Sequence, residues 1–400
     1  MPPRSRSSSL SRTSQTLISL AEALSRSGSH LEDTYWEGCL GEALDKALGA
    51  RHGRAVESAL DVLLEQRSAA YELLVELAEA RSESLQAGPD DQDFDTLLIS
   101  APVLAWTRYR LPNGQLGANT LQALETLLAE TVLSPDARVS LLPSLMRFDR
   151  LPQSFQETRN WTHTLGQRAL GLRRDGPALR DADAPEDLLA DVFFLVGAVV
   201  VPRGQAMFQW QSPTPAESPT QDTITRQWAE GCARILEPLF TGCQLEYLRP
   251  EAYYTSTRQA DQGIRPLTLK AAATWLQTAA RIPGTDLRAA LVACGEQTIE
   301  EYRIGFCTRQ NNDVIYGCVW PALSREESQP DPDAEGEIDT WDTIAALLRE
   351  CGIQDIRRLP GLQPLEFCED CGTPYFPNML GEMQHPELPE EIDPEPVQFH

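Results

Sequence analysis

Two cysteines in the last tenth of the chain, Cys368 and Cys371, have the spacing of zinc-knuckle ligands. They belong to a Cys-x-x-Cys-Gly sequence. A tight turn that ends at Gly372 lets backbone amides point at two thiolates, which suits a soft tetrahedral metal ion. A structural zinc ion takes four ligands, and the chain has no second Cys-x-x-Cys pair. His385 is the nearest further candidate, so the sequence predicts a zinc site at Cys368, Cys371 and His385.

The fourth ligand of this site stays open at the level of sequence. A reduced thiol pair in a tight turn, with no metal, is the alternative interpretation. A redox pair of the thioredoxin type is disfavoured because Cys368 does not open a helix after a strand. Candidates for the fourth ligand are Cys351, His400, Glu366 and Asp370.

A second group of residues could bind a small anion. These residues follow two predicted strands that each stop at a proline, and open α/β sheets place ligand crevices beyond the carboxyl ends of parallel strands. Arginine and tyrosine side chains there would donate hydrogen bonds to an anion, whereas polar loop residues that are merely solvated are the alternative. The candidates are Arg147, Tyr253, Tyr254 and Arg258.

His163 is the only histidine in the predicted α/β part of the chain, so a histidine-based acid–base mechanism would have to use it. It lies in a predicted helix beside Trp161, where a role in helix packing or at the helix surface competes with a catalytic one. The chain contains no Gly-x-Ser-x-Gly elbow, Walker loop, Gly-x-Gly-x-x-Gly or His-Glu-x-x-His sequence. The commonest hydrolase, nucleotide-binding and metalloprotease motifs are therefore absent.

The elements that must position these residues begin with a helical region. Apolar residues recur with helical period from Thr13 to about residue 88, where Gly88-Pro89-Asp90-Asp91 ends the pattern. The pattern predicts about four amphipathic helices that form a small cap.

Beyond this cap, three segments share one order of predicted elements: an apolar strand, a helix, and a short strand that stops at a proline. The closing prolines, Pro143, Pro250 and Pro360, are almost evenly spaced, which favours three related β-α-β units. Strand-helix-strand crossovers normally make parallel pairs, whereas residues 287–321 predict an antiparallel meander, so the sheet or sheets should be mixed. A further helix follows the first and second units, and the cysteine knuckle takes its place after the third.

The predicted fold class is α/β (or α+β), with an N-terminal helical cap, three β-α-β-type units and a C-terminal Cys-x-x-Cys knuckle. The predicted segments are a disordered basic tail (1–12), the helical region (13–88), three α/β units (94–186, 187–284 and 285–365), the knuckle (366–388) and an acidic tail (389–400).

Composition limits the partners and the compartment. The formal net charge of −25 argues against nucleic acid or anionic membranes, since phosphate groups would be repelled. No apolar run reaches the length of a membrane span, and no signal-peptide core follows the N-terminus. The nine cysteines are predicted to be reduced thiols. We expect a cytoplasmic protein whose partner is a protein or a small molecule; the oligomeric state is left open.

The C-terminal motif, together with Trp161-Thr162-His163 and the run from Glu301 to Phe306, resembles domain-of-unknown-function family 2863 of betaproteobacteria over nearly the whole chain. The recurring tail of that family looks like Cys-x-x-Cys-Gly-x-Pro followed by an aromatic residue and proline. The resemblance implies a bacterial, cytoplasmic protein and implies no particular reaction. Cys368, Cys371, Gly372, Pro374, Phe376 and Pro377 match the motif here.

Two functional hypotheses follow. The first is a non-enzymatic interaction or regulatory protein with a structural, zinc-binding knuckle. The second is an enzyme or sensor that binds a small anionic ligand through Arg147, Tyr253, Tyr254 and Arg258, with His163 as a base. The second requires these side chains to converge on one pocket.

Overall fold

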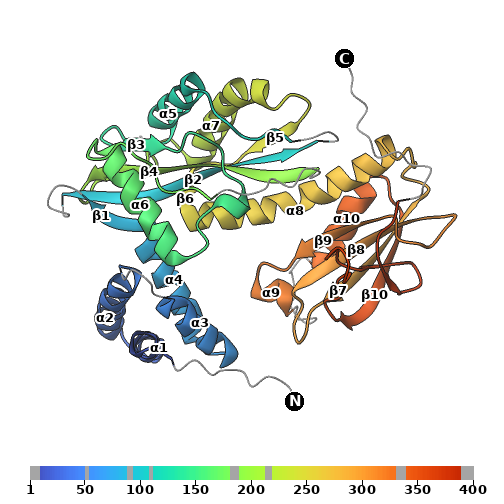
Figure 1. Ribbon diagram of the computed structural model, residues 1–400, viewed down its shortest axis with the longest axis horizontal. Coiled ribbons are helices and arrows are strands. Elements are labelled where there is room, and N and C mark those ends of the chain that lie inside the picture. Colours follow the sequence, from blue (N-terminus) through green and yellow to red (C-terminus); the bar gives the residue numbers. More distant parts are fainter. Residues whose placement is uncertain are drawn as a thin grey trace.

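The computed structural model describes residues 10–49, 54–87, 93–107, 111–180, 189–211, 219–329 and 339–388. It shows an α+β fold with an N-terminal helical region, two separate sheets and a C-terminal knuckle (Figure 1). Of the predicted basic tail, residues 1–9 lie outside the described ranges, and the first helix already begins at Arg12. The predicted acidic tail, residues 389–400, also lies outside them.

Four amphipathic helices form the N-terminal helical region, as predicted. Serines cap the first two: the hydroxyls of Ser11 and Ser29 each accept a backbone N–H from the first turn. Leucines from all four helices form one buried core. The helices are α1 (Arg12–Ser25), α2 (His30–Leu48), α3 (Ala55–Glu65) and α4 (Ala70–Glu83).

The first sheet is built on two long antiparallel strands, β2 (Phe94–Trp106) and β4 (Ala190–Pro202), which pair from end to end. Both are apolar on both faces because helices cover both faces of the sheet. Strand β3 (Arg138–Leu141) lies on the far side of β4. On the far side of β2 lie β1 (Ser84–Ala87), β6 (Glu251–Ala252) and β5 (Gln244–Tyr247).

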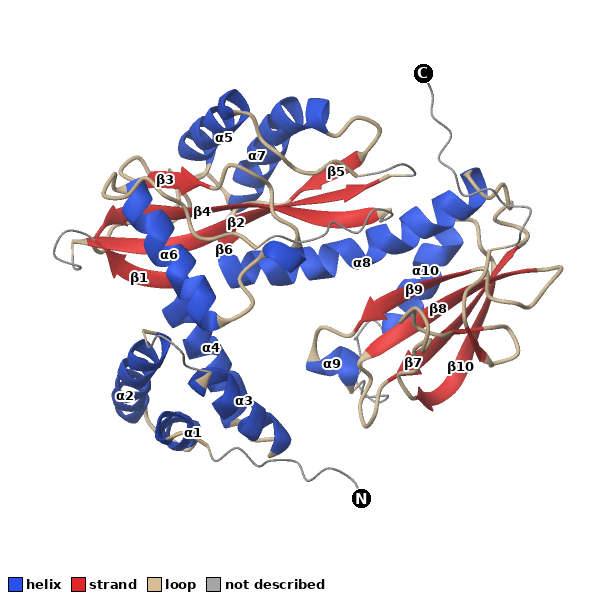
Figure 2. Ribbon diagram, in the orientation of Figure 1, coloured by secondary structure: helices blue, strands red, loops and turns tan. Residues whose placement is uncertain are grey.

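Two helices cover each face of this sheet (Figure 2). Helices α5 (Ala118–Thr131) and α7 (Gln221–Leu236) cover one face. Helix α6 (Phe155–Ala169) and the first half of α8 (Tyr253–Thr278) cover the other. The short 3-10 helices η1 (Phe148–Arg150) and η2 (Glu237–Leu239) lie in the connections.

The first two predicted units are interleaved in this sheet. Each runs strand, helix, strand, helix: β2-α5-β3-α6 and then β4-α7-β5-α8. The closing strand of each unit lies beside the opening strand of the other, β3 beside β4 and β5 beside β2. The two strands of a unit are therefore parallel but not adjacent. The expected adjacent pairs do not form because β4 occupies one edge of β2 and strands β1, β6 and β5 occupy the other.

The second sheet contains the third unit and the predicted meander. Its order is β10-β7-β8-β9, with β10 parallel to β7 and the other pairs antiparallel. Helix α10 and the second half of α8 cover one face, and the knuckle covers the other. The knuckle thus occupies the layer that α6 and α8 occupy on the first sheet. The elements are β7 (Leu287–Cys294), β8 (Glu301–Thr308), β9 (Tyr316–Pro321), α9 (Arg325–Ser328), α10 (Thr340–Glu350), β10 (Asp355–Gln363), β11 (Phe376–Pro377) and β12 (Met383–Gln384).

Helix α8 joins the two sheets. Its residues Tyr253 and Ala260 belong to the core of the first sheet, whereas Leu269 and Leu276 belong to that of the second. Within the described ranges, no helix combines the length and the apolar character that crossing a bilayer requires.

Candidate metal centre

The knuckle, residues 366–388, opens with a tight turn around the two cysteines. Phe367 and Pro374 form a β-bridge at its base. The Cys368 N–H donates to the Thr373 carbonyl at 2.8 Å, and the Gly372 N–H donates to the Cys368 carbonyl at 2.9 Å. Gly372 has a φ of +73°, a left-handed conformation that favours glycine. The turn therefore holds both thiols on one side of a short backbone loop.

The turn and the segment after β12 bring three possible metal ligands together. The ligand atoms of Cys368, Cys371 and His385 all lie within 4.8 Å of one another. The Cys371 Sγ is 3.2 Å from the His385 Nε2. Two thiolates and an imidazole are ligands that zinc and similar metal ions prefer. The three residues predicted from spacing therefore form a cluster that could hold a metal ion.

The surroundings of the second ring nitrogen of His385, Nδ1, are compatible with metal binding through Nε2. The Nδ1 atom is buried and has no hydrogen-bond partner among the described residues. A carboxylate oxygen of Glu387 lies 3.9 Å from it. Histidine ligands commonly direct the nitrogen that is not bound to metal toward a carboxylate, which fixes the ring orientation. Glu387 is thus a carboxylate near His385, at a separation longer than a hydrogen bond.

Hydrogen bonds prepare Cys371 as a thiolate. The side chain of Thr373, then its backbone, then His385 and Cys368 lower the pKa of the Cys371 thiol to about 6. The Thr373 hydroxyl lies 3.2 Å from the sulfur. Because the thiolate is the form that binds metal, Cys371 is available as a ligand at neutral pH.

The knuckle is fastened to the second sheet by Arg303 of β8, which is fully buried. Its guanidinium donates to the carbonyls of Glu366 and Tyr375 at 2.7 and 2.9 Å, and it pairs with the Glu301 carboxylate at 2.6 Å. It also lies over the Phe367 ring. This role of Arg303 was not predicted from the sequence. The signal was an arginine at the centre of an apolar strand, because a buried charge needs partners.

Two glycines let the knuckle approach the sheet closely. A Cβ atom on Gly305 would lie 2.0 Å from the Pro377 carbonyl oxygen, and one on Gly317 would lie 2.2 Å from the Phe376 ring. Glycine at these two positions of β8 and β9 is therefore required by the contact with β11.

No fourth ligand joins the cluster from the described residues. Cys351 packs on the α8 and α10 side of the second sheet, opposite the knuckle. Glu366 and Asp370 lie near the turn but outside the cluster. His400 lies outside the described residues. The cluster thus offers three ligands and leaves one coordination position for another group.

The residues predicted to bind an anion are distributed over both faces of the first sheet. The Arg147 guanidinium pairs with Asp191 at 3.2 Å and lies over the Phe193 ring, which belongs to the α5 and α7 face. Tyr253 is buried in the core of the opposite face. The structure therefore does not bring Arg147 and Tyr253 to one site.

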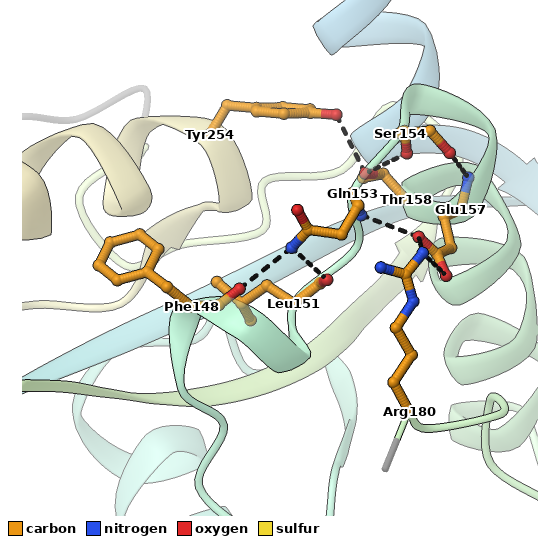
Figure 3. Close-up of polar contacts among 8 residues, drawn as sticks. All are labelled: Phe148, Leu151, Gln153, Ser154, Glu157, Thr158, Arg180 and Tyr254. Atoms are coloured by element: carbon orange, nitrogen blue, oxygen red, sulfur yellow. Dashed lines mark hydrogen bonds and ion pairs between the residues drawn. The ribbon is translucent and has the colours of Figure 1, made fainter. Parts of the chain in front are cut away.

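Tyr254 and Arg258 instead connect α8 to the helical region and to α6. Figure 3 shows the Tyr254 hydroxyl directed at Thr158 near the start of α6, with an oxygen separation of 3.0 Å. The Arg258 guanidinium donates to both oxygens of Glu79 in α4. The Tyr254 hydroxyl and one terminal nitrogen of Arg258 are thus engaged within the chain. Ligand binding by these residues remains a prediction, and nothing in the arrangement favours it.

Hydrogen bonds at the start of α6 fix the position of Thr158. Ser154 caps the helix by accepting the Glu157 N–H, and the Glu157 carboxylate accepts the Gln153 N–H in return (Figure 3). Arg180 holds the same carboxylate through two hydrogen bonds. One turn further along, His163 is exposed and lines a cleft.

Comparison with known proteins gives one match. The family model described as "Protein of unknown function (DUF2863)" matches residues 2–399. No curated protein and no solved structure gives a match. The match covers nearly the whole chain, from the helical region to beyond the knuckle, so the chain belongs to the DUF2863 family.

Proposed function

We propose that the knuckle binds one zinc ion through Cys368, Cys371 and His385, with a fourth ligand from outside this cluster, and that the metal is structural. The observation that carries the proposal is the mutual approach of the three ligand atoms, all within 4.8 Å. Zinc is the ion of choice because the set combines two thiolates with one imidazole, and zinc is bound by such mixed sets without redox chemistry.

A structural role is supported by where the knuckle lies. It is the layer that covers one face of the second sheet, and its apolar residues Phe376 and Met379 belong to the core on that face. A metal ion that closes the turn at Cys368 to the segment at His385 would stabilise this layer by joining its two ends. The corresponding layer of the first sheet is formed by helices α6 and α8, which need no such link.

The test is metal analysis of the purified full-length chain. We expect one zinc ion per chain in the wild type, and loss of zinc in the variants Cys368→Ser and His385→Gln. Cys351→Ser is the matched control, because this cysteine lies on the other face of the sheet and should leave the zinc content unchanged. A metal-free wild type that cannot be loaded with zinc at neutral pH would refute the proposal.

We further propose that the chain acts as an interaction or regulatory protein and not as an enzyme. The partner would be a protein or a small molecule, since the net charge of −25 disfavours nucleic acid and anionic membranes. The fourth coordination position and the exposed turn make the knuckle the first surface to test. Binding of a protein partner by Cys351→Ser but not by Cys368→Ser would support this role. Equal binding by both variants would contradict it.

A further inference from the structure

A cleft of about 1090 Å³ lies where the helical region meets the first sheet. Helix α6 supplies one wall through Gln156, Arg159, Asn160 and His163, which are spaced to lie on one face of the helix. The opposite walls come from the end of α2, from Arg81 of α4, and from β1 and β2. Ligand sites occur preferentially at such junctions between structural units.

Two arginines converge on a single carboxylate in this cleft. Arg81 and Arg159 both contact Asp45, through distances of 3.2 and 3.0 Å to its two oxygens. Arg159 also donates to the Arg81 carbonyl at 2.6 Å. One carboxylate neutralises only one of the two positive charges. The group of Arg81, Arg159 and Asp45 therefore carries one excess positive charge, and Asp95, which also lines the cleft, balances it over the whole lining.

Most hydrogen-bond donors of the two guanidinium groups remain available. Among the described residues, Arg81 and Arg159 each use one terminal nitrogen in their hydrogen bonds and ion pairs. A guanidinium has five N–H donors in a planar fork that matches carboxylate and phosphate oxygens. The free edges are partly exposed, since the Arg159 and Arg81 side chains are 25% and 42% accessible.

The arrangement is held by specific contacts. A Cβ atom on Gly41 would lie 2.3 Å from a terminal nitrogen of Arg81, so a side chain at this position would displace the guanidinium from its present place. On the sheet, Thr96 lines the cleft, and its hydroxyl is buried without a hydrogen-bond partner in the part of the chain that the structure describes. A buried polar group without a partner is uncommon and is often satisfied by a ligand or water. Asp95 also lines the cleft, and its carboxylate accepts the Gly204 N–H at 2.7 Å.

From these contacts we infer that the cleft binds a small organic anion, a carboxylate or phosphate ester, through Arg159 and Arg81 with Asn160 and His163 beside them. Among the described residues, the cleft lining contains no Phe, Tyr or Trp. This site is distinct from the metal cluster and from the four residues that the sequence suggested.

Histidine resonances report binding without knowledge of the natural ligand. In the full-length chain labelled with ¹⁵N-histidine, addition of inorganic phosphate or of citrate at constant ionic strength should shift the His163 signals saturably. The His163→Gln variant assigns them. His30, at the start of α2, lies outside the cleft lining and should not shift. A response to phosphate alone would indicate a phosphate ester, and a response to citrate alone a carboxylate.

Two variants separate binding from folding. Arg159→Gln should weaken binding at least about tenfold, because a charge-assisted hydrogen bond is lost. Asn160→Asp changes an exposed side chain, adds a negative charge and should weaken binding similarly while the chain stays folded. Arg168→Gln is the matched control on the same helix but outside the cleft, and should bind within about twofold of wild type. The inference is overturned if neither probe shifts His163, or if Asn160→Asp binds like the wild type.

Discussion

At the scale of single residues, Thr373 is the side chain that most directly sets the chemistry of the knuckle. It is the largest cause of the lowered pKa of Cys371, which stands at about 6, and His385 adds to the effect. The thiolate should therefore dominate above about pH 6 even when no metal is bound. Thr373 is close to Cys371 in sequence, and His385 is brought to it by the fold of the knuckle.

Replacing Thr373 by valine keeps the shape of the side chain but removes the hydroxyl. We expect the pKa of Cys371 to rise toward the ordinary range of thiols, because a hydrogen bond that favours the thiolate is lost. The measurement is the rate of iodoacetamide alkylation at Cys371 in chelator-treated protein between pH 5 and 9, located by mass spectrometry. The wild type should show a midpoint near 6. A midpoint that is the same in Thr373→Val would contradict the assignment, and Thr34→Val in α2 is the control.

The metal ligands could be predicted from sequence because they are close together along the chain. Cys368 and Cys371 share one turn, and His385 is the nearest further candidate. The group of Arg147, Tyr253, Tyr254 and Arg258 could not be assessed in this way, since whether such residues meet depends on which strands pair. The arginine cluster at Asp45 could not be predicted from the sequence for the same reason, since only the tertiary fold brings α2, α4 and α6 together.

At the scale of elements, the contact between β8 and β11 controls whether the knuckle docks. The backbone of Pro377 lies against Gly305 so closely that no side chain fits between them. The knuckle and the second sheet are thus matched through backbone contact as well as through the buried Arg303.

The variant Gly305→Ala tests this match. The added methyl group would lie 2.0 Å from the Pro377 carbonyl oxygen, so the knuckle must move. We expect a loss of about 1–3 kcal/mol in the free energy of unfolding, as for other overpacked sites, together with weaker zinc binding. Urea unfolding and zinc titration measure the two effects. Gly28→Ala, which meets no atom within 4 Å, should change neither; an unaltered Gly305→Ala protein would show that the contact is not required.

Sequence patterns predicted the elements better than their pairing. The four N-terminal helices follow from leucine periodicity, and the meander of the second sheet follows from short strands separated by turn residues. The adjacent parallel pairs expected for the first two units did not form. Local patterns specify a strand and its buried face, but the neighbour of β2 is decided by its end-to-end match with β4, which lies almost a hundred residues away in sequence.

At the scale of the whole molecule, Glu83 lies where the helical region, the first sheet and α8 meet. It ends α4, and its carboxylate accepts the Tyr254 N–H at the start of α8 at 2.9 Å. Burial raises the pKa of Glu83 to about 7, although the bond from Tyr254 acts in the opposite direction; Glu79 raises it further and Arg258 lowers it. The junction of three units therefore contains a carboxyl that titrates near neutral pH.

The raised pKa makes stability depend on pH. In the unfolded chain Glu83 ionises near its ordinary value of 4.5, so its favourable contribution is complete below that pH and is lost as the pH rises through about 7. Glu83→Gln removes this dependence and can still accept the Tyr254 N–H. We expect the variant to be more stable than the wild type at pH 8, by about 1–3 kcal/mol, and no more stable at pH 4.5.

Thermal and urea unfolding at the two pH values measure the difference. Glu76→Gln, another glutamate of α4, is the control and should show no such crossover. A difference between Glu83→Gln and wild type that is the same at both pH values would contradict the raised pKa.

The interleaving of the first sheet also bears on how the chain is made. A ribosome releases β2 and the closing strand of the first unit long before β4, on which both of them pair, and β5 follows later still. Neither of these two strand-helix-strand-helix units can complete its own hydrogen-bonded ladder while it is the only one outside the exit tunnel. The nascent chain must therefore carry an unfinished apolar strand through most of the synthesis of the first sheet. During that interval the N-terminal helical region can already fold, because its buried core residues all come from α1 to α4, which have left the ribosome.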